Sequence, residues 1–156
     1  MNNPIVFQKL LTEQWLSPAQ ILSSLSHLTH LVYLKNVNQP VIAFFASEYM
    51  LKQDQIIQSF KRVSLHHYQE KSSPIHFNHF FKNHTQNHQS DFKGGLIGFI
   101  SYDAVVQQQV SLQEKKQPAL FLGIYRSYLK LTQQGWTFFS DEDEAEEIFQ
   151  LIQNAL

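Results

Sequence analysis

The sequence predicts an α+β domain made mostly of antiparallel, sandwich-like β-sheets with flanking helices. Short runs rich in β-branched and aromatic residues alternate with turn signals, as in LVYLKN (31–36) and PVIAFF (40–45). The expected elements follow the order helix, several strands, helix, strand, loop, hairpin, helix. That order differs from the strict alternation of a parallel βαβ fold, and it favours mostly antiparallel sheets.

The first helix is expected over residues 18–28. Ser17 is a good N-cap, Pro18 fits the first helical position, and Gln20 can complete a capping box. The apolar residues that follow lie on one face at helical spacing, namely Ile21, Leu22, Leu25 and Leu28.

Two further helices are predicted by similar signals. Ser73-Pro74 begins a segment with three phenylalanines at helical spacing, which predicts a helix over 74–86. The last helix is expected to begin at Asp141, with Ser140 as its cap and acidic residues suited to its positive end.

The remaining β-rich segments predict further strands, although residues 1–16 give no clear element. Gln133-Gln134-Gly135 is expected to be a turn, and 105–118 an exposed loop. The expected strand segments are Tyr49–Leu51, Ile56–Leu65, the glycine-led run 94–103, the alternating run 119–132 and the returning strand 136–140.

Composition excludes several functional classes. The chain has 156 residues, of which 43% are hydrophobic and 13% aromatic, so it can form a real core. Its net charge of -1 provides no overall field for nucleic acid or an anionic membrane. It has no cysteine, no signal-peptide pattern and no apolar run of about 20 residues. We therefore expect a soluble, cytoplasmic domain without nucleic-acid or membrane partners.

No catalytic or metal-binding constellation is evident. His76/His79 and His84/His88 have spacings that can place two imidazoles on one helical face, but no carboxylate is placed as a third ligand. His66-His67 would point to opposite faces of a strand. The acidic run 141–147 lacks the glycine and distal glutamate of a calcium loop. We expect surface histidines, a solvated helix start, no metal site and no catalytic residue.

Three glycines suggest close packing of the backbone. Gly94, Gly95 and Gly98 lead into a strand, whereas the glycines of a phosphate loop follow a strand and open a helix. They are better explained by a bend in the strand or by the close approach of another backbone or a ligand.

The segment from Phe92 to Asp103, FKGGLIGFISYD, strongly resembles the signature F-x-G-G-x-x-G-(Y/F)-x-x-Y-D. This signature belongs to the N-terminal domain of anthranilate synthase component I and aminodeoxychorismate synthase component I. Its matching positions include Tyr102 and Asp103. PALFLGIY (118–125) is similar to the strand P-x-x-x-x-G-(I/V)-Y of the aminodeoxychorismate branch, and the resemblance covers about residues 15–150.

The resemblance implies that residues 1–156 form a non-catalytic scaffold or regulatory domain. In the family, a C-terminal catalytic domain binds chorismate and magnesium, and a glutamine amidotransferase subunit supplies ammonia. The apolar ending at Leu156 is compatible with a chain cut at a domain boundary. The full-length transferase would make 4-amino-4-deoxychorismate for para-aminobenzoate and folate synthesis, and this chain alone is expected to be inactive.

The family's N-terminal domain also contains a tryptophan pocket with a Leu-Leu-(Glu/His)-Ser motif. Leu34, Lys35 and Asn36 occupy that place here, so the resemblance implies them as pocket residues. Lysine and asparagine depart from the motif. Three alternatives stay open: the anthranilate synthase domain of tryptophan synthesis, a stand-alone tryptophan sensor, and a histidine-rich metal-binding protein.

Overall fold

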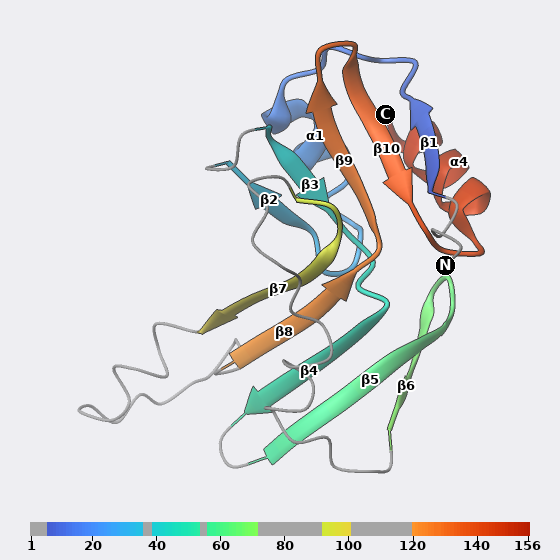
Figure 1. Cartoon of the computed structure of the whole chain (residues 1–156). Helices are drawn as coiled ribbons and strands as arrows, with labels where there is room; N and C mark the ends of the chain where they lie inside the picture. Colours follow the sequence, from blue (N-terminus) through green and yellow to red (C-terminus); the bar gives the residue numbers. More distant parts are fainter. Residues whose placement is uncertain (1–5, 36–38, 54–55, 72–91, 101–119) are drawn as a thin grey trace, which may run out of the picture. The chain divides into compact units, whose positions relative to one another are not determined.

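The structure is a computed structural model that describes residues 6–35, 39–53, 56–71, 92–100 and 120–156 (Figure 1). The chain divides into two compact units. Unit 1 comprises Met1–Ala46, Asn87–Gly94 and Tyr125–Leu156, and unit 2 comprises Ser47–Gln86 and Gly95–Ile124. Neither of the helices described has the length and apolarity needed to cross a membrane.

Unit 1 contains a five-stranded sheet, called sheet A here, with strand order β1-β10-β9-β3-β2. Every neighbouring pair in it is antiparallel. Its strands are β1 (Phe7–Leu10), β2 (Val32–Leu34), β3 (Val41–Ala43), β9 (Ser127–Thr132) and β10 (Gly135–Ser140). The antiparallel pairing of β9 with β10 confirms the predicted hairpin at Gln133-Gln134-Gly135, and the β-rich runs 31–36 and 40–45 pair as β2 and β3. Strand β1 adds an element within the segment that gave no clear one.

Helix α1 (Pro18–Ser24) begins as predicted and ends earlier. The Ser17 hydroxyl accepts a hydrogen bond from the backbone N–H of Gln20 at 3.2 Å, and the Ser17 N–H donates to Gln20 Oε1 at 2.9 Å. The predicted end at residue 28 is wrong, because Leu25 is already the C-cap. Leu25 and Leu28 continue the helical spacing of apolar residues, but they lie in the turn after the helix and are buried there.

The start predicted for the last helix is also wrong. Helix α4 (Ala145–Ala155) has Glu144 at its N-cap, without a side-chain hydrogen bond to the helix. Ser140 instead accepts the N–H of Glu142 at 3.1 Å, in the turn that precedes the helix. The acidic residues Glu146 and Glu147 do lie in the first turn, where the helix dipole favours negative charge.

Aromatic side chains form the contact between α4 and sheet A. Phe149 of α4 lies 5.7 Å from Phe138 and 6.2 Å from Phe7, measured between ring centroids. Phe138 stacks in turn on Phe44 at 6.2 Å. In Figure 1, α4 lies beside β1. One face of sheet A therefore packs against the helix, and burial of these rings stabilises that contact.

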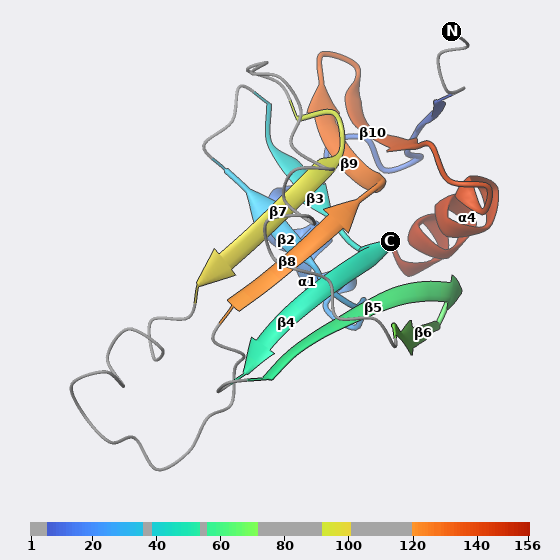
Figure 2. The same ribbon diagram turned by 60° about the horizontal axis from the view of Figure 1, so that its bottom comes forward.

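Unit 2 contains a second five-stranded sheet, called sheet B, with strand order β6-β5-β4-β8-β7 (Figure 2). Strand β4 pairs antiparallel with β5 and with β8, and β5 pairs antiparallel with β6. The strands are β4 (Glu48–Gln53), β5 (Ile56–Ser64), β6 (His67–Glu70), β7 (Gly95–Ile100) and β8 (Leu120–Tyr125). The prediction of mostly antiparallel sheets is confirmed, and their sandwich-like arrangement stays a prediction.

The two faces of sheet B differ in composition. One face carries the aliphatic cluster Met50, Leu122 and Ile124, with Leu96 and Leu120 packed against it. On the other face Tyr49 is central: its ring lies 4.7 Å from Phe60, 5.0 Å from Tyr68 and 5.9 Å from Phe121. Phe99 extends this aromatic row, 5.4 Å from Phe121.

The predicted strand segment 119–132 is two strands. Its first part, β8, belongs to sheet B and its second, β9, to sheet A, with the break at Arg126. Arg126 is exposed and pairs with Asp141. The predicted helix 74–86 and loop 105–118 lie outside the described residues.

Candidate functional site

Gly94, the first glycine of the signature, lies where its segment crosses another backbone within unit 1. Gly94 has φ +83° and Gly95 φ +124°, both conformations that favour glycine. A Cβ atom on Gly94 would lie 3.0 Å from the carbonyl oxygen of Tyr125 and 3.7 Å from the Tyr128 ring. The prediction of a close backbone approach is therefore confirmed at Gly94, whereas a Cβ atom at Gly95 would meet nothing within 4 Å.

Gly98 has the same role inside sheet B. A Cβ atom there would overlap the Leu122 side chain and lie 2.8 Å from the carbonyl oxygen of Phe121. The last two signature positions, Tyr102 and Asp103, lie outside the described residues.

Two of the three residues implied for a tryptophan pocket are described. Leu34 is the last residue of β2, half-buried, and pairs with Val41. Lys35 follows it and is exposed. Asn36 lies outside the described residues. The structure thus places this motif at an edge strand of sheet A.

Leu34 lies in line across sheet A with a buried lysine, Lys130. Directly opposed residues share a face, so Leu34, Val41 and Lys130 lie on one face of sheet A. We call it the Lys130 face; its members are Gln8, Leu10, Val32, Leu34, Val41, Ala43, Tyr128, Lys130, Thr132, Thr137 and Phe139. Lys130 is 8% exposed, which is unusual for a lysine.

Two aromatic rings lie close to the Lys130 ammonium. Its Nζ atom lies 5.8 Å from the centroid of Tyr128 and 5.7 Å from that of Phe139. The Tyr128 ring stacks on Phe139 at 5.4 Å, and Phe92 meets its edge at 5.1 Å. Burial, with a further contribution from the charge of Asp141, raises the pKa of Tyr128 to about 12. The Tyr128 hydroxyl therefore stays protonated at neutral pH.

The sequence pattern does not identify Lys130. Alternation in the run 127–132 places Lys130 and Tyr128 opposite Leu129 and Leu131, as the strand confirms, but such a pattern usually means that one face is solvated. Here both faces are buried, from Ser127 through Lys130. A tyrosine two residues before the lysine, on the same face, is a weak signal of an aromatic neighbour.

Tyr125, the tyrosine of the Gly-Ile-Tyr segment, has a structural role. It is fully buried, and its hydroxyl donates a 2.8 Å hydrogen bond to the carbonyl oxygen of His30. His30 has φ +59°, which is costly for a residue other than glycine. The hydrogen bond holds this turn between α1 and β2.

Replacing Tyr125 with phenylalanine tests that role. Tyr125→Phe removes only the hydroxyl, and we expect it to lower the free energy of unfolding by about 1 kcal/mol, because the His30 carbonyl loses a buried donor. Urea denaturation followed by tryptophan fluorescence measures the change. Tyr33→Phe on edge strand β2 is the control, expected within about 0.5 kcal/mol of wild type; equal effects of the two variants would contradict the assignment.

His30 makes the stability of unit 1 depend on pH. Burial lowers the pKa of His30 from 6.5 to about 4. The unfolded chain then takes up the proton more readily than the folded chain. The contribution to stability is complete above pH 6.5 and is lost as the pH falls toward 4. We expect the loss to be about 1–2 kcal/mol, because the ring is partly exposed and screened by solvent.

The variant His30→Asn checks this pH dependence, since asparagine tolerates the positive φ and does not titrate. Its stability is expected to fall less than that of the wild type when urea midpoints are compared at neutral and acidic pH. His27→Asn, at an exposed histidine nearby, is the control and keeps the wild-type slope. Parallel slopes for all three proteins would exclude His30 as the source.

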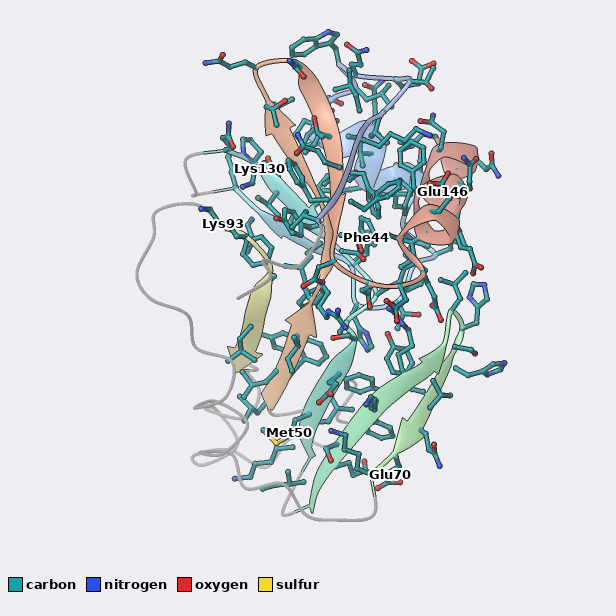
Figure 3. All side chains as sticks on the ribbon, turned by 45° about the vertical axis from the view of Figure 1, so that its right-hand side comes forward. Phe44, Met50, Glu70, Lys93, Lys130 and Glu146 are labelled. Atoms are coloured by element: carbon teal, nitrogen blue, oxygen red, sulfur yellow. The ribbon has the colours of Figure 1, made fainter. Side chains whose placement is uncertain are left out.

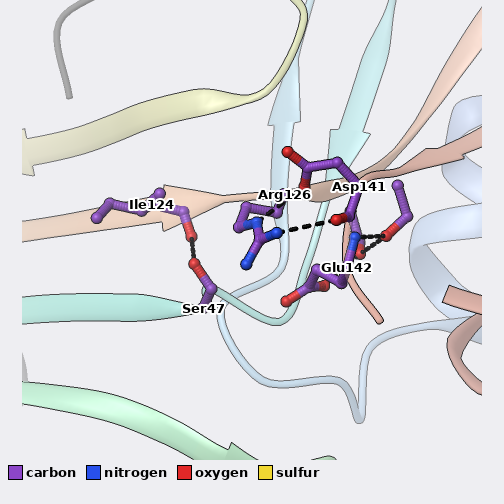
Figure 4. Close-up of polar contacts among 7 residues, drawn as sticks. Ser47, Ile124, Arg126, Asp141 and Glu142 are labelled. Carbon is purple, nitrogen blue, oxygen red and sulfur yellow. Dashed lines mark hydrogen bonds and ion pairs between the residues drawn. The ribbon is translucent and has the colours of Figure 1, made fainter. Parts of the chain in front are cut away.

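The start of the acidic run joins β9 and β10 instead of forming a cation site. Arg126 Nε donates to Asp141 Oδ1 at 2.8 Å, and its Nη2 donates to the Asp141 carbonyl at 2.9 Å (Figure 4). The buried Ser127 and Ser140 hydroxyls are 2.8 Å apart, and Ser127 also donates to the Glu142 carboxylate. The Arg126–Asp141 pair is exposed, so it contributes little energy and mainly fixes the turn.

Metal ligands are not assembled in the part of the chain that the structure describes. No group of three or more His, Asp or Glu side chains there could hold a metal ion. His66 lies in a turn and His67 opens β6. The pairs His76/His79 and His84/His88 lie outside the described residues.

Comparison with models of known protein families gives no match, and no curated protein sequence matches the chain. The geometry of the site is a close approach of Gly94 to Tyr125 and Tyr128, beside a buried lysine next to the rings of Tyr128 and Phe139.

Proposed function

We propose that this chain is the N-terminal, non-catalytic domain of an aminodeoxychorismate synthase component I. The observation that carries the proposal is the contact between two segments that resemble this family in sequence. Gly94 of the double-glycine segment lies against the carbonyl of Tyr125, the tyrosine of the Gly-Ile-Tyr segment. These residues are 31 positions apart in the chain. Both segments also supply neighbouring strands, β7 and β8, to sheet B.

The chemistry of these residues supports a scaffold role. Gly94, Gly95 and Gly98 shape the backbone, and Tyr125 holds a turn through its hydroxyl. None of these groups is an acid, a base or a nucleophile suited to amination of chorismate. The proposal therefore assigns chorismate binding, magnesium and catalysis to a further domain C-terminal to Leu156, and ammonia supply to a glutaminase partner.

The Gly-Ile-Tyr segment favours the aminodeoxychorismate branch over the anthranilate branch. Aminodeoxychorismate synthase and anthranilate synthase share their substrates and differ in product, so identifying the product distinguishes the two branches. The native protein can be isolated from its own cells with an antibody raised against this chain. It is then incubated with chorismate, ammonia and magnesium, beside the recombinant 156-residue chain.

The proposal predicts a native protein several tens of kilodaltons heavier than 18 kDa that forms 4-amino-4-deoxychorismate, and no turnover by the recombinant chain. Anthranilate as the product would move the chain to the other branch. A native band at 18 kDa, or turnover by the recombinant chain, would contradict the proposal.

A further inference from the structure

Two residues other than glycine have a left-handed backbone in the part of unit 1 that the structure describes. His30 has φ +59° and Phe45 has φ +51°. A positive φ is costly for any residue with a Cβ atom, and for a residue as bulky as phenylalanine it is an outlier. Such conformations persist only where the surrounding structure fixes them, and they are found at switch regions.

The two residues lie at the same end of the hairpin formed by β2 and β3. The ladder ends at the pair Val32 and Ala43, and counting its register on by two positions brings His30 opposite Phe45. Both strands therefore leave the sheet at the same level. With an extended backbone at both residues, which is the ordinary conformation of a strand, the ladder would continue through them.

Hydrogen bonds and burial hold the observed arrangement. The Thr29 carbonyl accepts the Phe45 N–H at 3.0 Å, and the His30 carbonyl accepts the Tyr125 hydroxyl at 2.8 Å. Phe45 is 2% exposed, and its ring meets that of Phe44 edge-on at 5.9 Å. Figure 3 shows Phe44 among the side chains between sheet A and α4. These contacts offset the backbone strain at both left-handed residues.

Tyr125 links this end of the hairpin to the crossing at Gly94. Its hydroxyl holds His30, while its own carbonyl oxygen would lie only 3.0 Å from a Cβ atom on Gly94. A shift of the backbone at Gly94 therefore moves the residue that holds His30. Three segments that are distant in sequence are connected through this one tyrosine.

We propose that His30 and Phe45 form a two-state latch that is controlled from the Gly94 crossing through Tyr125. In the closed state, which the structure shows, both residues are left-handed and Tyr125 donates to His30. In the open state both residues are extended, and the hydrogen bonds to the Thr29 and His30 carbonyls are released. Opening is local, and the rest of sheet A stays folded. The latch goes beyond the proposed function, since it assigns a conformational change that the enzyme product does not report.

Amide hydrogen exchange of the full chain, followed by NMR, measures the opening. The Phe45 N–H reports on the latch, and the N–H of Leu129, fully buried in the central strand β9, reports on unfolding of sheet A. After correction for intrinsic rates, we expect the Phe45 N–H to exchange about tenfold or more faster. Equal rates would overturn the proposal, because Phe45 would then be released only when the sheet unfolds.

Two variants of His30 test whether backbone strain drives the opening. His30→Gly and His30→Ala both remove the imidazole and keep the carbonyl that Tyr125 binds, but only glycine removes the cost of the positive φ. We expect the Phe45 N–H to exchange about fivefold or more slowly in His30→Gly than in His30→Ala. The same rate in both variants would overturn strain as the cause.

Gly94→Ala tests the control from the crossing, and Gly95→Ala is its matched control. Both variants add a methyl group at a positive φ, but only the one at Gly94 places it against Tyr125. We expect Gly94→Ala to raise the exchange rate of the Phe45 N–H about threefold or more, and Gly95→Ala to leave it within about twofold of wild type. Equal rates in the two variants would overturn the coupling.

Tyr125→Phe covers the case in which Gly94→Ala does not fold. It removes only the hydroxyl that closes the latch, so we expect the Phe45 N–H to exchange about fivefold faster than in the wild type. An unchanged rate would overturn the role of Tyr125. Failure of the latch leaves the proposed function intact, since that function is judged by enzyme product and growth requirement.

Discussion

Trp136→Ala is expected to lower the free energy of unfolding of unit 1 by about 3–5 kcal/mol. Trp136 on β10 is fully buried. Its indole N–H donates to the carbonyl of Leu16 at 2.7 Å, and its backbone N–H donates to the carbonyl of Gln14 at 2.8 Å. Truncation leaves a large cavity and removes the donor from the Leu16 carbonyl, so the segment before α1 loses an attachment to sheet A.

The chain supplies its own control for this variant. Trp15 is 68% exposed although its neighbours Gln14 and Leu16 are both held by Trp136. Trp15→Ala should stay within about 0.5 kcal/mol of wild type. Urea denaturation followed by far-UV circular dichroism measures both variants, because Trp136→Ala leaves the exposed Trp15 as the remaining tryptophan. A loss below about 1 kcal/mol in Trp136→Ala would contradict the packing described here.

Gly98→Ala is expected to destabilise sheet B by about 1–3 kcal/mol. The added methyl group would lie 2.8 Å from the carbonyl oxygen of Phe121 and overlap the Leu122 side chain. The Leu122 side chain can change rotamer, but the backbone oxygen moves only if β7 and β8 separate. The third glycine of the signature is therefore required by strand packing.

Gly95→Ala separates crowding from backbone strain. A Cβ atom at Gly95 meets nothing within 4 Å, but the residue has φ +124°. The cost of Gly95→Ala therefore comes from backbone strain alone, about 1–3 kcal/mol.

Thermal unfolding followed by circular dichroism compares the glycine variants. Gly98→Val should lose more stability than Gly98→Ala, because the valine side chain is larger. Retention of wild-type stability by Gly98→Val would exclude the close approach.

Local signals in the sequence predicted elements well where their cause is local. The Ser17 capping box depends on residues within four positions of each other, and it forms as predicted. The break at Arg126 has no such signal, because β8 and β9 are both β-rich and only the pairing of distant strands assigns them to different sheets. The predicted start of α4 is wrong because the two residues expected to begin the helix have other partners in the preceding turn. Ser140 accepts the N–H of Glu142, and Asp141 accepts a hydrogen bond from Arg126.

The candidate site was predictable only in part. The glycines of the signature indicated a close approach, since glycine is required wherever a Cβ would collide. Lys130 was not predictable, because its neighbours come from distant parts of the chain: β9 lies between β3 and β10, and Phe92 packs against Tyr128 from 36 residues away in sequence. Long-range packing of this kind leaves no periodic signal in the strand itself.

Deletion of the gene in its own organism tests the central claim most directly. If the chain belongs to an aminodeoxychorismate synthase component I, the deletion strain requires 4-aminobenzoate for growth and does not respond to anthranilate or tryptophan. Growth restored by anthranilate or tryptophan instead would assign the chain to the anthranilate branch. Growth that requires none of these compounds would contradict a role in chorismate amination.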